Sequence, residues 1–384
     1  MNTKNAALSV AGVLLAAGIA SAQTPAPPAA SQDAQAPAGQ PAAAPAPTPP
    51  PSPFTRWGTD FSFLADGYVD GNFNHPDSGF NGLRNFDMRS DTAHFNMGMI
   101  TIDHAPAPVG FHLDAGFGQI FHVMSATDSA PSEMDYIKQA YVSFKPKSWH
   151  GLEVDAGKFV TAAGAEVIET NQNWDYSRSL LFAWAIPYYH YGIRTSFPIG
   201  PHFTAGVQFV NGWNSFQDPS GKEFGLNGAY AWKKVTWTNV YYAGPDHSQP
   251  GQGWRHLFDT TVQVNPTDKF SYYINFDYGR DKKLGPAFQW TGIAGAARYA
   301  VGKKSAVAAR LEWFDDMDGF STGTPQSVKE FTLTGEYKVT GWLLSRLEFR
   351  DDWSNQPFFQ KNDGSSRNQP TVLLGMVAFV GPKK

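Results

Sequence analysis

From about residue 60 to the C-terminus, the chain consists of short runs in which apolar and polar residues alternate. In residues 270–278 a large apolar or aromatic side chain recurs at every second position. The same pattern returns in residues 203–209, 305–313, 329–339 and 343–350. A period of two puts alternate side chains on opposite faces of an extended chain, so each run predicts a β-strand with one apolar face.

The breaks between these runs are tight and long in turn. The tight breaks fall at residues 105–108, 145–148, 198–201, 232–234, 265–268, 302–304 and 339–341. The long breaks fall near residues 74–90, 122–134, 161–186, 212–223, 243–254, 279–288, 315–327 and 353–369. Short turns at one end of the strands and long loops at the other are typical of an antiparallel barrel in an outer membrane. The pattern therefore predicts an all-β fold, a closed antiparallel transmembrane β-barrel of about 16 strands (range about 14–18), with both termini at the short-turn end.

A soluble β-sandwich would show the same period of two, so the aromatic residues help to separate the two folds. Rings gather at the ends of the runs. Those beside tight breaks are Phe144, Trp149, Tyr230, Trp232, Tyr337 and Trp342, and those beside long breaks are Trp213, Tyr241, Tyr242, Trp254, Trp290, Trp313 and Trp353. Two aromatic belts are typical of strands that end at the two interfaces of a membrane. Charged residues make up only 17% of the chain, which is low for a soluble surface.

Strand parity assigns residues to the two faces of the predicted wall. One face of the last strands carries Arg310, Glu312, Arg346, Glu348 and Arg350, and the other carries Leu311, Leu347 and Phe349. We expect the charged set to face water inside the barrel and the apolar set to face lipid. A register slip of one residue would reverse every assignment.

The first 53 residues are expected to lie outside the barrel. Residues 1–22 combine a positive start, a short apolar run and a small-residue cleavage site, which is the pattern of a secretory signal peptide. Residues 23–53 are nearly all Ala, Pro, Gln, Ser and Thr, and they predict a disordered linker. The barrel then spans residues 54–384. The chain contains no Cys, which excludes disulfides and thiol-ligated metals.

Five segments of the chain are similar to one known family. They are residues 105–111, 157–194, 210–214, 255–259 and 348–354. The second segment contains Tyr-Ser-Arg-Ser, then Ile-Pro, then Gly-Ile-Arg. Over essentially residues 57–380 the chain resembles the OmpL-like outer-membrane porins of the beta-barrel porin-2 family. The resemblance implies a diffusion channel in a bacterial outer membrane. Outer-membrane lipid and small hydrophilic solutes are the partners that it implies, and a homo-oligomer is left open.

The long break at residues 161–186 carries most of the candidate chemistry. In one interpretation it packs on the barrel mouth and pairs its own charges. In the other it folds into the lumen and narrows it, with its carboxylates facing basic residues of the wall, since opposed rings of charge filter polar solutes. The candidate pore-lining residues are Lys158, Glu166, Glu169, Asp175, Arg178, Arg194, Arg298, Arg310, Glu312, Arg346, Glu348 and Arg350.

A water-filled lumen predicts a porin through which small hydrophilic solutes diffuse passively. Two other functions stay open. A structural or adhesive barrel would act through its extracellular loops, and a wide lumen without an infolded loop would favour it. A barrel hydrolase would need a catalytic triad, for which the candidate residues are Ser177, Ser179, His190 and Asn173. We expect a channel without enzymatic activity, cofactor or bound metal. The net charge of −4 gives no reason to expect a nucleic-acid partner.

Overall fold

The computed structural model describes residues 52–126, 132–217, 221–245, 253–282 and 285–382. The expected signal peptide, residues 1–22, and all but the end of the expected linker, residues 23–53, lie outside this part of the chain. The long strands are β2 (Thr59–Asn72), β3 (Ala93–His104), β4 (Val109–Phe117), β5 (Ile137–Phe144), β6 (Glu153–Val160), β7 (Tyr189–Pro198), β8 (Phe203–Val210), β9 (Glu223–Trp232), β10 (Val235–Gly244), β11 (Arg255–Val264), β12 (Phe270–Asp281), β13 (Phe288–Ala300), β14 (Ser305–Asp316), β15 (Gln326–Lys338), β16 (Leu343–Ser354) and β19 (Asn368–Val380). The short elements are β1 (Thr55–Arg56), α1 (Gln119–Ser125), η1 (Ser132–Tyr136), η2 (Lys147–Trp149), η3 (Thr170–Gln172), η4 (Leu181–Ala185), β17 (Phe359–Lys361) and β18 (Gly364–Ser366).

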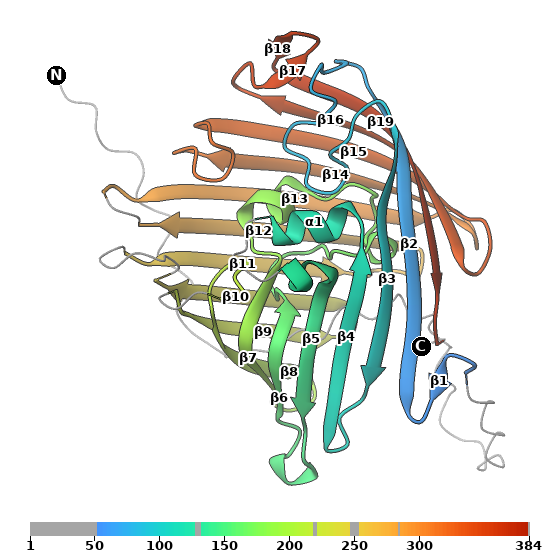
Figure 1. The fold of residues 1–384 in the computed structure, drawn as a ribbon, viewed down its shortest axis with the longest axis vertical. Coiled ribbons are helices and arrows are strands. Elements are labelled where there is room, and N and C mark those ends of the chain that lie inside the picture. Colours follow the sequence, from blue (N-terminus) through green and yellow to red (C-terminus); the bar gives the residue numbers. More distant parts are fainter. Residues whose placement is uncertain (1–51, 127–131, 218–220, 246–252, 283–284, 383–384) are drawn as a thin grey trace.

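The long strands form a closed antiparallel barrel. Each strand from β2 to β16 pairs with the next long strand along the chain, and β16 pairs with β19. The ring closes because β19 pairs with β2, from Thr371 opposite Asn72 to Val380 opposite Phe63. Figure 1 shows these two strands side by side, although they come from opposite ends of the described chain. β1 adds two residue pairs to β2, and β17 and β18 form a separate hairpin. The predicted closed barrel of about 16 strands is confirmed.

The connections alternate as the sequence predicts. The turn between β9 and β10 has two residues, 233–234, whereas the connection between β6 and β7 runs from residue 161 to 188. The first long strand begins and the last one ends at the short-turn end, as expected. Within the described residues, no helix is both long enough and apolar enough to cross a bilayer.

Side chains alternate between the outer wall and the interior. On β14, Leu311 is 63% exposed on the outer wall, while Arg310 on the interior side is 0% exposed. On β16, Leu347 and Phe349 are exposed and Arg346 is buried. The predicted face of each of these residues is therefore confirmed. A continuous apolar outer surface is what a barrel surrounded by lipid requires.

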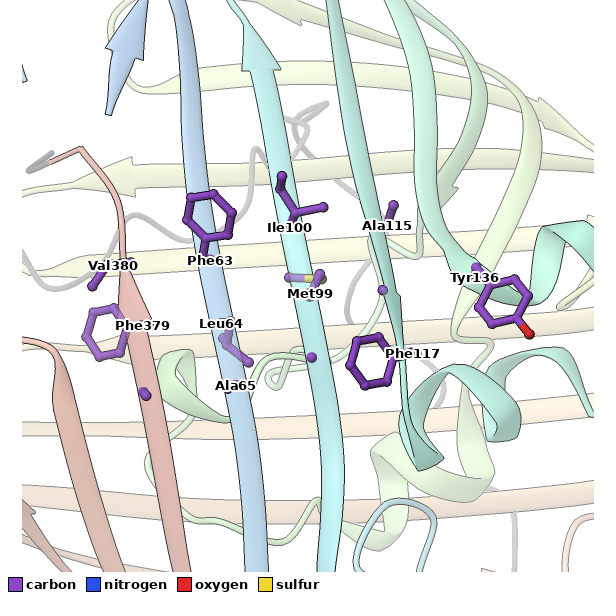
Figure 2. A pocket seen from close by; sticks show the side chains of 13 residues that line it. Phe63, Leu64, Ala65, Met99, Ile100, Ala115, Phe117, Tyr136, Phe379 and Val380 are labelled. Carbon is purple, nitrogen blue, oxygen red and sulfur yellow. The ribbon is translucent and has the colours of Figure 1, made fainter. Parts of the chain in front are cut away.

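Small residues align on three neighbouring strands of the outer wall. Ala378 of β19 lies opposite Ala65 of β2, which lies opposite Gly98 of β3. A shallow groove of about 770 Å³ follows this row, and Phe63 and Phe117 stand at its sides (Figure 2). The groove is almost purely apolar, in keeping with its place in the lipid-facing wall.

The outer wall yields a stability prediction. We expect Leu347→Arg to lower the free energy of unfolding by about 2–4 kcal/mol, because the guanidinium would lie in the middle of the lipid-facing band. Thr340→Arg is the matched control, since Thr340 lies exposed in the turn between β15 and β16 and should cost about 0–1 kcal/mol. Reversible urea unfolding in lipid vesicles measures both values. Equal losses in the two variants would show that Leu347 does not face lipid.

Candidate functional site

The connection between β6 and β7 reaches the opposite wall of the barrel. Its two ends are adjacent, since Val160 pairs with Tyr189. β14 lies eight strands round the ring from β6, which is the farthest position in a ring of 16. Even so, Glu166 of this connection forms an ion pair with Arg310 of β14, with 2.7 Å between its Oε1 and the guanidinium Nη1. We call residues 161–188 the crossing loop, because the segment spans the lumen and returns.

Wall carboxylates hold the backbone of the crossing loop. Glu348 of β16 accepts hydrogen bonds from the backbone N–H groups of Tyr176 and Ser177 at 2.6 and 3.1 Å. Glu312 of β14 accepts one from the N–H of Leu180 at 3.1 Å. These carboxylates accept hydrogen bonds from backbone N–H groups that have no partner in a strand or helix. They therefore remove the free-energy cost of burying unpaired backbone donors in an irregular segment.

Wall arginines hold the carbonyl groups of the same loop. Arg346 donates to the carbonyl oxygens of Thr170 and Asp175 at 2.5 and 3.1 Å. Arg350 donates to the carbonyl oxygen of Arg178 at 2.5 Å. The charged inner face of β14 to β16 thus binds the loop backbone by charge-assisted hydrogen bonds, which are stronger than neutral ones.

One guanidinium lies among four carboxylates at the centre of this contact. Arg310 is within 2.7 Å of Glu166, 3.0 Å of Glu330, 3.1 Å of Glu312 and 3.5 Å of Asp175. All five side chains are buried. Burial raises the pKa of Asp175 to about 7 in spite of the nearby Arg310. The cluster therefore holds more acid groups than Arg310 alone can neutralise, and Arg350 adds a second cation 3.8 Å from Glu330.

The crossing loop is also cross-linked internally. Arg178 donates to the carbonyl oxygen of Val167 at 3.1 Å and to Oγ1 of Thr170 at 3.0 Å. The side-chain amide of Asn173 donates to the Val167 carbonyl at 2.7 Å and accepts from the Val167 N–H at 2.9 Å. Arg178 thus stabilises the loop through hydrogen bonds within it, and its side chain is buried.

A second set of contacts fixes the loop to the strands near the barrel closure. The hydroxyl of Tyr176 donates to Asp66 of β2 at 2.7 Å. Glu169 forms an ion pair with Lys138 of β5, and Lys138 also lies 2.8 Å from Asp114 of β4. The loop is therefore held on several sides of the lumen. The interpretation in which it folds into the barrel agrees with this geometry, and the one in which it pairs its own charges at the mouth does not.

An apolar core fills the space between the loop and the wall of β12 to β14. Leu181 and Phe182 of the loop pack in one buried cluster with Trp290 and Phe314. The indole N–H of Trp290 donates to the carbonyl oxygen of Ala185 at 3.0 Å. The prediction that Trp290 belongs to the long-loop aromatic belt is therefore wrong, and Tyr242 is likewise fully buried. Both rings find loop partners inside the barrel that sequence position alone does not reveal.

The expectation that the charged wall residues face water is not met. Arg310, Glu312, Arg346, Glu348 and Arg350 do point into the barrel, but all five are buried by the crossing loop. Glu166 and Glu169 do not face basic residues across a gap either, since each contacts its cation directly. The physical reason is that buried polar groups of irregular backbone need hydrogen-bond partners, and these wall side chains supply many of them.

The remaining candidates lie apart from the loop contact. Arg194 of β7 pairs with Asp155 at 2.8 Å, and its side chain is 19% exposed. Arg298 of β13 pairs with Glu336 at 2.7 Å, and its side chain is 24% exposed. These two cations point to the interior and still contact solvent.

Lys158 departs from the expectation that it lines the lumen. It pairs with Ala140 and Tyr191 in the two flanking strands. Directly opposed residues share a face, and this face also carries the exposed Val142 and Ile193. Lys158 therefore projects from the outer side of the wall, where it is buried with its ammonium 4.1 Å from the ring centroid of Tyr189.

The residues of the hydrolase hypothesis have other partners. Oγ of Ser177 accepts hydrogen bonds from Arg310 and Arg350 at 3.3 and 3.2 Å. Nδ1 of His190 lies 2.9 Å from the carbonyl oxygen of Gly212. Within the described ranges, no hydrogen bond joins Ser177 to His190, and no group of three or more acidic or His residues could hold a metal ion.

Comparison with known proteins agrees with this architecture. The family model described as "Putative beta-barrel porin-2, OmpL-like" matches residues 58–379. Among solved structures, the chain is similar to an anion-selective porin from Comamonas acidovorans, with a TM-score of 0.58, 11% identity, and coverage of 84% of this chain and 99% of that one. It is also similar to OprB of Pseudomonas putida (TM-score 0.56, 14% identity, 84% and 94% covered) and to the channel DcaP of Acinetobacter baumannii (0.54, 10%, 84% and 97%). At such identities the likeness concerns the fold alone. A search of curated proteins finds no match.

Proposed function

The chain belongs to the OmpL-like beta-barrel porin-2 family of outer-membrane proteins, and from this premise we propose how its channel admits solutes. The barrel gives small hydrophilic solutes a passive route across the outer membrane, and the crossing loop narrows that route. The observation that carries this proposal is the contact of Glu166 with Arg310, eight strands away from the loop's own origin. A loop held at that point must reduce the open cross-section of the lumen.

We propose that the solvated cations Arg194 and Arg298 act on passing solutes more than the buried cluster does. The crossing loop shields the buried cluster from the passage. Arg194 and Arg298 are each paired with a carboxylate but still contact solvent, so they can act on ions in a narrow passage with low-dielectric walls. Glu166 and Glu169 then serve mainly to fix the loop. Because pairs of opposite charge lie along the passage, we expect it to admit polar solutes of either charge sign rather than to select strictly for one sign.

This proposal gives a prediction for ion preference. In planar bilayers with a salt gradient, the combined variant Arg194→Gln and Arg298→Gln should shift the reversal potential toward cation preference, because two positive charges leave the passage. The control combines Lys361→Gln and Arg367→Gln, which remove two exposed cations from the loop between β16 and β19. An unmoved reversal potential in the first variant, or an equal shift in the control, would contradict the proposed lining.

The rival functions receive less support. A wide lumen without an infolded loop would favour an adhesive barrel, whereas here the crossing loop spans the lumen. We propose that the protein is not an enzyme, since Ser177 and His190 are engaged elsewhere. The proposed channel does not depend on homo-oligomerisation, because one barrel already encloses a complete lumen. Cross-linking of the purified protein would measure it.

A further inference from the structure

The short-turn end of the barrel carries an arc of lysines. Four neighbouring turns are involved, at residues 233–234, 265–269, 301–304 and 338–342. They hold Lys233, Lys234, Lys269, Lys303, Lys304 and Lys338, and we call these six residues the lysine arc. All six are exposed. The turns join consecutive strands from β9 to β16, so the arc follows half of the barrel edge.

The positive charge of the arc is hardly compensated. Its turns contain a single acidic residue, Asp268. Among the described ion pairs, none includes a lysine of the arc, whereas Lys145 of another short turn pairs with Glu153 at 2.8 Å. The described long loops differ, because the one at 355–367 mixes Asp363 with Lys361 and Arg367. Uncompensated exposed charge on one edge of the barrel indicates an anionic partner.

The arc lies at the level of the membrane interface. Each turn adjoins an outward-facing aromatic residue of the wall, and these residues are Trp232, Phe270, Tyr299, Tyr337 and Trp342. The ammonium of Lys233 lies 4.3 Å from the ring centroid of Trp232. Aromatic belts mark the height of lipid headgroups, and lysines beside them extend to the phosphates.

Lysine side chains join the four turns in two neighbouring pairs. Nζ of Lys234 donates to the carbonyl oxygen of Pro266 in the next turn. Nζ of Lys304 donates to the carbonyl oxygen of Val339 at 3.4 Å, again in the next turn. Turns recur at every second strand, roughly 10 Å apart. The arc is thus a row of separate cationic turns rather than one compact pocket. Each turn can contact a different lipid headgroup.

We propose that the lysine arc binds anionic phospholipid headgroups of the periplasmic leaflet. Short turns of outer-membrane barrels face the periplasm, so the arc meets the phospholipid leaflet there. A phosphodiester accepts hydrogen bonds from lysine ammonium groups, and the surrounding aromatic rings hold the acyl region against the wall. The preference of the barrel for anionic over zwitterionic lipid arises from this edge.

Lipid selectivity measured with spin-labelled lipids tests the proposal. The full-length protein is placed in phosphatidylcholine vesicles with a trace of spin-labelled phosphatidylglycerol or phosphatidylcholine, and the motionally restricted fraction is compared. At low salt the relative association constant of phosphatidylglycerol should be about fivefold higher, which corresponds to about 1 kcal/mol near a lysine. The preference should decrease with added salt.

Two variants of equal charge change separate the arc from general electrostatics. Replacement of Lys233, Lys234, Lys303 and Lys304 by Gln should bring the ratio close to one. The control replaces Arg280, Lys329, Lys361 and Arg367 by Gln, all exposed at the long-loop end, and should keep most of the preference. The heat-modifiable band on a gel verifies folding of both barrels.

A preference that survives in the arc variant, or that is lost equally in the control, would overturn the proposal. If the arc variant loses binding to isolated peptidoglycan while its lipid preference is unchanged, the lipid proposal is also overturned. That result would identify a cell-wall polymer as the partner.

Discussion

Arg310→Met should lower the free energy of unfolding by about 3–5 kcal/mol, the range found when one member of a buried ion pair is removed. The guanidinium is fully buried and lies within 3.1 Å of carboxylate oxygens of Glu166, Glu312 and Glu330. Without it these carboxylates repel one another where water cannot screen them, and the crossing loop loses its central attachment. Urea unfolding in vesicles measures the stability change. The same variant should show larger and noisier currents.

Two further variants make this prediction specific. Lys329→Met removes one cation from the exposed outer rim of β15 and should change stability by about 0.5 kcal/mol or less. Adding Glu330→Gln to Arg310→Met should restore part of the lost stability, because one uncompensated carboxylate is removed. A loss of less than about 1 kcal/mol in Arg310→Met would mean that the cluster is hydrated and does not hold the loop.

The barrel could be predicted from the sequence because lipid imposes a strict period of two on every strand. Leu311 beside Arg310 is enough to assign both faces of β14, and the structure agrees. The same rule would have assigned Lys158 correctly, because it shares its parity with Val154 and Ala156 rather than with Asp155. Charge alone therefore does not show that a strand residue lines the lumen.

The interior could not be predicted to the same degree, since it depends on contacts between distant segments. Leu180 and Glu312 are 132 residues apart in the chain, yet they share a hydrogen bond. Gly375 also owes its role to a contact with a distant segment. A Cβ at this position would lie 2.1 Å from the ring of Tyr176 in the crossing loop. No local pattern distinguishes this glycine from one that permits strand curvature. Parity predicts which way a residue points, but not what covers it.

Excision of the crossing loop should widen the channel without opening the barrel. Residues 165–183 can be replaced by a short Gly-Ser linker, because the loop begins and ends at the directly paired Val160 and Tyr189. Water can then enter the lumen and solvate Arg310 and its carboxylates, so the wall charges keep a favourable environment. The strand ring does not include the loop, and the folded heat-modifiable band should persist.

The single-channel conductance of this loop-excised protein, compared with that of the unmodified protein in planar bilayers, measures directly whether the crossing loop limits the passage. We expect small, discrete current steps for the unmodified protein and steps several-fold larger after excision, because the loop occupies the cross-section between β6 and β14. Equal steps in the two folded proteins would contradict this expectation and show that the crossing loop does not limit the passage.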